Sequence, residues 1–427
     1  MTMDIVFVVV FVLAYLAITL EHTLGINKSA PALIGAGVLW SLYAFHATDP
    51  QVLTSHLNES LITTAQIVFF LMGAMTIVEV VDAHNGFEVI TQRIRTQQLS
   101  TLMWLVGGVT FFLSAVLDNL TTAIVMVSLM KKLLREREDR LFFAGIIVIA
   151  ANAGGAWSPI GDVTTTMLWI GGQITAWAIM KTLIIPSLIA ALIPLAITAW
   201  LLRGRVVHSP EADTSASAHH QAEGPLMFWS GLGILVSVPV FKTLTGLPPY
   251  IGMLLGLGVL WLLGDWVHRD KPEDDKAHLS LVHSLSRIDM GSLTFFIGIL
   301  LAVAVLEHAH LLTNLAQWLN HTVGRMDLIV VLIGLASAVV DNVPLVAATM
   351  GMYSLADHPP DSFLWEFIAY CAGTGGSVLI IGSAAGVAAM GLERIDFFWY
   401  VKRISGLALA GYLAGALAYI VQFNLTH

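Results

Sequence analysis

The chain of 427 residues is too apolar to fold as a globule in water. Hydrophobic residues make up 57% of it and charged residues only 11%, with a formal net charge of -9 and a mean hydropathy of +0.80. Its apolar runs repeatedly approach the roughly 20 residues that cross a bilayer, which predicts an all-α polytopic membrane protein. The single cysteine, Cys371, excludes an internal disulfide, and no Cys/His cluster in the sequence has zinc-like spacing.

The apolar segments predict ten membrane spans, five on each side of a polar stretch at 204–225. The first five are expected at 3–20, 29–47, 61–82, 141–176 and 181–202, and the second five at 226–244, 249–267, 290–309, 363–391 and 404–423. The polar stretch is rich in Pro, Ser, Ala, His and Glu, which cannot support a packed core. We therefore expect two transmembrane repeats, 1–203 and 226–427, joined by a linker.

Between the third and fourth span of each half lies a segment too short for two crossings and too long for one. The first contains SAVLDN at 114–119 and the second contains SAVVDN at 337–342. A re-entrant helical hairpin that turns at the Asp-Asn pair fits both segments. An ionised aspartate in mid-membrane costs about 2.5 to 3.5 kcal/mol on insertion scales, so a duplicated one implies a function such as handling ions or protons. Asp118 and Asp341 are therefore the leading functional candidates.

Further pairs of short sequences recur in the same order in both halves and indicate an internal duplication. They are Phe69-Phe70 and Phe295-Phe296, Ala83-His84 and Ala309-His310, and Gly154-Gly155 with Gly161 and Gly375-Gly376 with Gly382. Five crossings is an odd number, so the two repeats are expected to be inverted relative to each other across the membrane.

The basic residues predict the orientation of the chain. Of the 20 Lys and Arg residues, 17, including Lys28, fall in one set of loops, and only Lys181, Lys242 and Arg325 fall in the other. Loops rich in Lys and Arg stay in the cytoplasm. The linker at 204–225 is therefore expected to be cytoplasmic and both termini external, with the first hairpin entering from the cytoplasm and the second from outside.

The hairpin tips have two interpretations. A helix that starts inside the membrane exposes unpaired N–H groups, which Asp and Asn side chains can cap. Capping alone needs no charge, because Asn would serve, so an Asp in both copies favours a site for a cation or a proton. The candidates at the tips are Asp118, Asn119, Thr121, Thr122, Asp341 and Asn342.

A second interruption is expected in the fourth span of each half. In the first half, Gly154, Gly155 and Ser158 lie in a segment with Pro159, and we expect an unwound backbone there whose freed carbonyl groups suit a small hard cation. Asp162 adds a third buried carboxylate. The equivalent loop of the second half contains Gly375, Gly376, Ser377 and Ser383. Because Ser383 stands where Asp162 does, the cation site is expected to lean towards the first half.

Weaker candidates end the third span of each half. They are Glu79, Asp82 and His84 in the first half, and Glu307 and His308 in the second. We weigh solvated span ends near opposite membrane surfaces against a role in a cavity or in sensing pH.

These motifs resemble a known group of proteins. Two inverted five-span repeats, each with a re-entrant hairpin and a broken helix, resemble the ion transporter superfamily, and the paired SAVxDN motifs with GGAWSPIGD at 154–162 resemble its NhaD-type sodium/proton antiporters. Dicarboxylate carriers of that superfamily have an uncharged Ser-Asn-Thr at the hairpin tips, whereas Asp-Asn stands here. The resemblance implies a sodium and proton site at Asp118, Asn119, Thr121, Asp162, Asp341 and Asn342, with sodium at the three aspartates and contributions from Ser377 and Ser383.

The resemblance also implies a function. A protein of this kind exchanges cytoplasmic sodium or lithium for external protons by alternating access, which extrudes sodium and supports pH homeostasis. Such a protein lies in the bacterial inner membrane and can form a homodimer. It is not an enzyme, and it needs neither a cofactor nor a nucleic-acid partner.

Three alternatives stay open at this point. An anion carrier for a dicarboxylate or a metalloid oxyanion is disfavoured by three buried acids and by the expected lack of any Lys or Arg inside the membrane. An intramembrane aspartyl protease carries Tyr-Asp and Gly-x-Gly-Asp, whereas here Leu117 precedes Asp118 and Pro159-Ile160-Gly161 precedes Asp162. A channel would share the re-entrant hairpins but would lack saturable flux driven by a counter-gradient.

Overall fold

The computed structural model describes residues 3–47, 49–91, 96–207, 223–269, 272, 276 and 278–426. Over these ranges the chain is helical, and its β pairing amounts to one isolated bridge between Gln98 and Val206. Seven of the described helices are long and apolar enough to cross a membrane, and an eighth span results if one bent pair is counted. The prediction of an all-α polytopic membrane protein is confirmed.

The helices before the linker are α1 (Met3–Thr19), α2 (Glu21–Leu24), α3 (Ser29–His46), α4 (Pro50–Ala83), α5 (Glu88–Thr91), α6 (Leu99–Ser114), α7 (Asn119–Leu133), α8 (Arg137–Ala156), α9 (Val163–Ile170) and α10 (Ala176–Leu201). The helices after it are α11 (Gly224–Thr245), α12 (Pro249–His268), α14 (Leu281–Arg287), α15 (Met290–His308), α16 (Leu311–Val323), α17 (Met326–Ala336), α18 (Asn342–Met352), α19 (Phe363–Gly375), the short 3-10 helix η1 (Ile380–Gly382), α20 (Ala384–Glu393), α21 (Phe397–Tyr400), the π-helical turn η2 (Val401–Ser405) and α22 (Gly406–Thr426).

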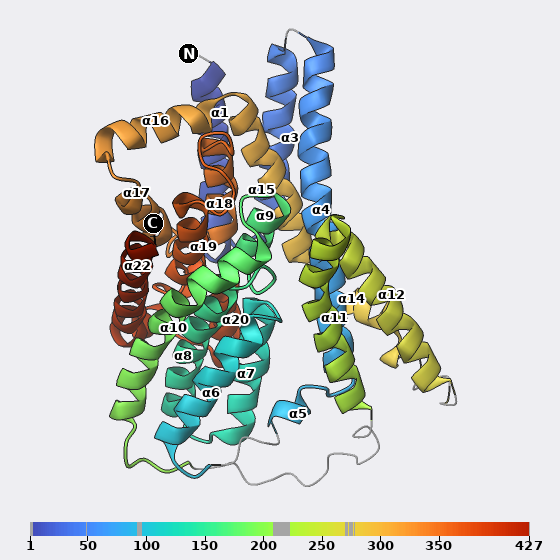
Figure 1. Cartoon of the computed structure of the whole chain (residues 1–427), viewed down its shortest axis with the longest axis vertical. Helices are drawn as coiled ribbons and strands as arrows, with labels where there is room; N and C mark the ends of the chain where they lie inside the picture. Colours follow the sequence, from blue (N-terminus) through green and yellow to red (C-terminus); the bar gives the residue numbers. More distant parts are fainter. Residues whose placement is uncertain are drawn as a thin grey trace.

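Two helices differ from what hydropathy predicts. Helix α4 begins 11 residues before the expected span at 61–82, because Asp49 caps it and Pro50 occupies its first turn, both of which start a helix regardless of apolarity. Helix α16 was not expected. It is amphipathic, buries Leu312 and Ala316, and meets α17 at 117°. In Figure 1 it lies across the upper end of the molecule.

Helices break where the sequence predicts interruptions. Residues 115–118 separate α6 from α7, and 337–341 separate α17 from α18. In the fourth segment of each half, 157–162 separate α8 from α9, and 376–383 separate α19 from α20. The inverted relation of the two halves stays a prediction.

The helices pack in two groups that meet at these breaks. In one group, α3 packs on α1 and α15, while α4 packs on α11, α12 and α15. In the other, α10 packs on α22, α6 and α7 on α8, and α17 on α19. Figure 1 shows α4, α11 and α12 beside the bundle of α6 to α10. Helices α9 and α18 bridge the groups, because α18 contacts α15 and α9 contacts α4. The helix starts therefore lie at the junction.

Several of the basic residues predicted to share one side gather at one end of the bundle. Arg205 after α10 pairs with Asp139 of α8 at 2.7 Å, and Arg140 pairs with Glu393 of α20 at 3.2 Å. Lys131 of α7 donates a hydrogen bond to the carbonyl oxygen of Leu392. Most of the predicted linker at 204–225 lies outside the described residues, so its cytoplasmic location and the division into repeats stay predictions.

Candidate ion-binding site

Four helices that begin at the breaks each carry a capping side chain. Asp118 Oδ1 accepts from the Thr121 N–H at 2.7 Å, and Asp162 Oδ1 accepts from the Thr164 N–H at 2.9 Å. In the second half, Asp341 Oδ1 accepts from Val343 N at 3.2 Å, and Ser383 Oγ accepts from Gly386 N at 3.2 Å. Capping therefore occupies one oxygen of each carboxylate, and the second oxygen is engaged by other groups.

Asp162 is the carboxylate on which both hairpin tips converge. Its side chain is buried, with 2% of the residue exposed. Its Oδ2 accepts hydrogen bonds from Asn119 Nδ2 at 2.8 Å and from Asn342 Nδ2 at 3.4 Å. The Asn of each duplicated motif thus points at the one acid that is not duplicated.

Asn152, which no sequence motif singles out, joins the two halves. It is fully buried on α8, and its Oδ1 accepts from Asn119 Nδ2 at 2.9 Å. Its Nδ2 donates to Ser377 Oγ and to Ser383 Oγ, each at 2.9 Å. The signal in the sequence is an amide side chain two residues before the Gly pair of an otherwise apolar helix segment. Asn152 therefore links the first hairpin tip to the second broken helix.

Asp341 forms an ion pair that is not evident from the sequence. Its Oδ2 lies 3.0 Å from Lys28 Nζ, and the same ammonium lies 4.5 Å from the centroid of the Phe295 ring. Lys28 lies in the loop between α2 and α3, as expected, but the expectation that no Lys or Arg is present at the site is wrong. Hydropathy alone cannot detect a basic residue whose burial is offset by a carboxylate and an aromatic ring.

A cavity of about 60 Å³ brings these groups together. Its polar lining includes Asp118, Asn119, Asp162, Asp341, Asn342 and Lys28. Apolar residues of α4, α11, α12 and α15 close its other side. Ser377 and Ser383 lie behind the cavity wall, where they accept from Asn152. Three carboxylates against one ammonium give the lining a formal charge of -2 when all are ionised.

The two threonines of the first tip differ in their contacts. The Thr121 hydroxyl donates to Asp118 Oδ2 at 2.9 Å, so Thr121 satisfies both oxygens of that carboxylate. The Thr122 hydroxyl is buried and has no hydrogen-bond partner among the described residues. In the first break, Ser158 Oγ accepts from Ile160 N at 3.4 Å.

Gly154, Gly155 and Gly375 are helical, contrary to the expected unwound backbone, whereas Gly376 and Ser158 lie in the breaks as expected. Gly154 and Gly155 lie in the last turn of α8, and Gly375 ends α19 with Gly376 directly after it. A Cβ on Gly154 would lie 2.1 Å from the Phe111 carbonyl oxygen of α6, and one on Gly375 would lie 1.9 Å from the Gly334 carbonyl oxygen of α17. These glycines allow each hairpin to approach its broken helix, while the break itself follows them.

The first serine of each duplicated motif also holds the hairpin against the broken helix of its half. Ser114 Oγ donates to the Ala151 carbonyl at 2.6 Å, and Ser337 Oγ donates to the Ala372 carbonyl at 3.0 Å. Each acceptor precedes the Gly pair of its half by three residues. The duplicated motif therefore positions a hairpin tip as well as supplying its polar groups.

Two of the weaker candidates line a cavity of about 610 Å³ next to the site. Glu79 and Asp82 lie in its wall, and Glu79 pairs with Arg287 at 2.8 Å. This cavity shares Met75, Val78 and Leu120 with the smaller one. The larger cavity therefore adjoins the site and extends to Lys132 and Arg287, two of the basic residues predicted to share one side.

Glu307 and His308 line a separate cavity of about 600 Å³, which has none of its lining residues in common with the site. The His308 ring stacks on His56 with ring centroids 4.1 Å apart, and His308 Nε2 lies 3.0 Å from Ser60 Oγ. His84 lines neither cavity and instead contacts His268.

Carboxylate and amide oxygens grouped at helix breaks can hold a hard cation or a proton. Together with the fold, they are typical of a helical membrane transporter. The chain belongs to the citrate transporter family, CitMHS, whose model matches residues 9–366. This family and the relatives of the chain are transporters and not enzymes.

The names of individual relatives specify the transported ions more closely than the family description does. The chain is 51% identical to sodium/proton antiporter 1 of Arabidopsis thaliana over 99% of its own length and 73% of that protein. It is 31% identical to the Na(+)/H(+) antiporter NhaD of Alkalimonas amylolytica over 97% of its length and 89% of that protein. In structure it resembles the YdaH transporter of Alcanivorax borkumensis, with a TM-score of 0.59 at 14% identity over 89% of this chain and 90% of that one.

Proposed function

We propose that the protein exchanges sodium or lithium for protons at the cavity around Asp162. The observation that carries the proposal is the convergence of Asn119 and Asn342 on Asp162 Oδ2, with Asp118 and Asp341 lining the same cavity. The names of the relatives at 51% and 31% identity support the same exchange.

Competition between protons and cations for the carboxylates couples the movement of one to the movement of the other. Three acids around one small cavity repel one another when all are ionised, and either a proton or a cation relieves that repulsion. Binding of one therefore opposes binding of the other. Asp162 is the proposed shared ligand, because its Oδ2 contacts both tips and would be reoriented by movement of either hairpin.

The arrangement of the cavities favours an opening of the site towards the cytoplasm. The cavity of about 610 Å³ shares lining residues with the site and extends to Arg287 and Lys132, whereas the one of about 600 Å³ at Glu307 shares none with the site. Loops rich in basic residues favour the cytoplasm, so we place the linker there and both termini outside. From the similarity to the bacterial Na(+)/H(+) antiporter NhaD we also propose a bacterial inner membrane. Alternating access then requires the site to open in turn to the first and to the second cavity.

The charge of Lys28 is relevant to whether the substrate is an anion, as the description of the citrate transporter family suggests. A single ammonium that is paired with Asp341 at 3.0 Å leaves two unpaired acids, Asp118 and Asp162, at the cavity. An anionic substrate would be repelled by them, whereas a cation would be attracted. The site therefore favours a cation.

Everted vesicles that contain the protein test this proposal. With an imposed proton gradient, added sodium or lithium should release protons from the lumen, while citrate salts of a non-transported cation should have no effect. Proton movement that follows citrate and not the cation would overturn the proposal.

A further inference from the structure

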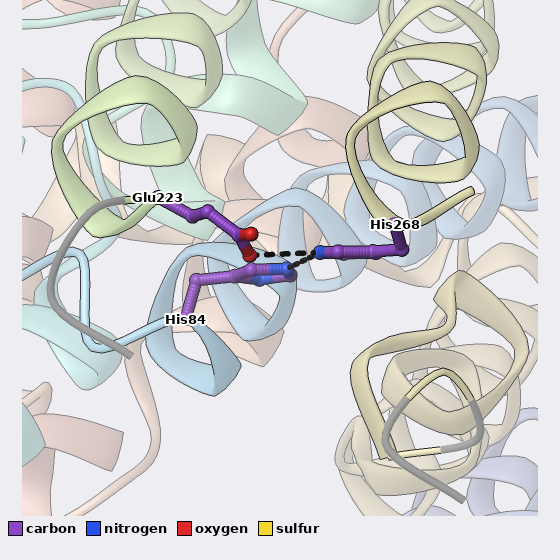
Figure 2. A group of neighbouring side chains, drawn as sticks. All are labelled: His84, Glu223 and His268. Atoms are coloured by element: carbon purple, nitrogen blue, oxygen red, sulfur yellow. Dashed lines mark hydrogen bonds and ion pairs between the residues drawn. The ribbon is translucent and has the colours of Figure 1, made fainter. Parts of the chain in front are cut away.

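Three side chains from distant parts of the chain meet where the linker joins α11. His84 follows the last residue of α4, Glu223 precedes Gly224 at the start of α11, and His268 ends α12. Figure 2 shows the three side chains pointing toward one another. The Nε2 atoms of the two imidazoles are 3.0 Å apart, and Glu223 Oε2 lies 3.2 Å from His268 Nε2.

Two imidazole nitrogens and a carboxylate oxygen form a typical ligand set for Zn²⁺. With metal–ligand bonds of about 2.1 Å, neighbouring ligands of a tetrahedral ion lie about 3.4 Å apart. The three ligand atoms all lie within 4.8 Å of one another, and the two contacts at 3.0 and 3.2 Å are within a few tenths of that spacing. Small shifts of the side chains would therefore admit an ion.

The orientation of His84 is already suited to metal binding. Its Nδ1 lies 2.6 Å from the Val80 carbonyl oxygen, which can only accept, so Nδ1 carries the proton. The Nε2 lone pair of the neutral ring then faces His268. Metal-binding histidines commonly donate their other N–H to a carbonyl in this way. Both imidazoles are buried, with 2% of His84 and 5% of His268 exposed.

We infer that His84, Glu223 and His268 form a binding site for a divalent transition metal of the Zn²⁺ type. A bound ion ties the end of α4 to the start of α11 and the end of α12. Asn85 and Phe87, which follow His84, line the cavity of about 610 Å³, so the ion is placed beside the proposed cytoplasmic route. The binding inference does not rest on sodium/proton exchange.

Zinc titration of the full-length protein tests the inference. The protein is purified through a tag without histidine or cysteine, stripped with a chelator and titrated with Zn²⁺ against a fluorescent indicator. We expect one tight site per chain, weakened tenfold or more by His268→Ala and by Glu223→Gln. His321→Ala removes an exposed histidine of α16 and serves as the matched control with unchanged affinity. Equal affinity in the parent and in His268→Ala, or no tight site in the parent, would overturn the inference.

Cobalt spectroscopy keeps the test informative if an alanine variant does not fold. His268→Cys exchanges one zinc ligand for another, so Co²⁺ should bind it and give a thiolate-to-cobalt charge-transfer band. The native cysteine, Cys371, is fully buried and should not contribute. The band should be absent from His321→Cys. A folded His268→Cys protein without the band would contradict the site.

Discussion

Asn152→Ala removes the side chain that connects the first hairpin tip to the second broken helix. Asn152 accepts one hydrogen bond from Asn119 and donates one each to Ser377 and Ser383, all at 2.9 Å. A buried hydrogen bond contributes about 1 kcal/mol net, so losing three costs about 3 kcal/mol. This loss affects the ion-binding site, because Asn119 also donates a hydrogen bond to Asp162 Oδ2.

The expected result is a large loss of exchange with a moderate loss of stability. If most of the 3 kcal/mol falls on the arrangement that binds the cation, the rate at low sodium falls by about a hundredfold, since about 1.4 kcal/mol corresponds to a factor of ten. The assay is sodium-dependent proton movement in everted vesicles at matched protein levels, with thermal unfolding of the purified protein alongside.

Ser187→Ala is the matched control for Asn152→Ala. Ser187 is fully buried on α10, and its hydroxyl has no hydrogen-bond partner among the described residues, so its loss should leave exchange and stability near those of the parent. If Asn152→Ala exchanges sodium and unfolds as the parent does, the role of Asn152 as the link between the halves is refuted.

Three further predictions concern the tips, the ion pair and the Gly pairs. Asp118→Asn and Asp341→Asn should each abolish sodium-dependent proton movement while the protein still reaches the membrane, because an amide is cheaper to bury than a carboxylate; normal exchange by both would contradict the site. Lys28→Ala should lower the half-saturating sodium concentration, because Asp341 loses a competing cation 3.0 Å away, and a rise would count against that competition. Gly375→Ala should lower the unfolding temperature, because its Cβ would lie 1.9 Å from a carbonyl oxygen of α17, whereas Gly108→Ala, with nothing within 4 Å, should not; equal unfolding temperatures would refute the close approach.

The sequence predicts the hairpin tips and Asp162 because each places a charge in an apolar segment. That contrast is local, so Asp118, Asp162 and Asp341 can be found without knowing what faces them. Asn152 lacks such a contrast, since a single amide in a helix is often satisfied by local contacts. Its partners Ser377 and Ser383 are more than 200 residues away. Their contact depends on tertiary packing.

The depth of a residue within the fold does not follow from the hydropathy of its segment. Lys28 follows an apolar segment and was assigned to a loop, because hydropathy does not reveal how far a loop dips into the fold. Gly154 and Gly155 were expected to unwind a helix, since the sequence does not distinguish a flexible glycine from one that permits close packing. The contact between His84 and His268 does not follow from the sequence either, because the two residues are 184 positions apart and have no zinc-like spacing.

The most direct test of the account is sodium binding by Asp162→Asn. The parent protein, purified and held at alkaline pH, should bind ²²Na⁺ in a manner displaced by protons, and Asp162→Asn should not bind it. Asp139→Asn is the matched control, because Asp139 is also a buried acid of the first half, on α8, but pairs with Arg205 away from the cavity. The Asp139→Asn control should bind sodium as the parent does. Proton-sensitive sodium binding that persists in Asp162→Asn would contradict the central claim that this carboxylate is the shared ligand.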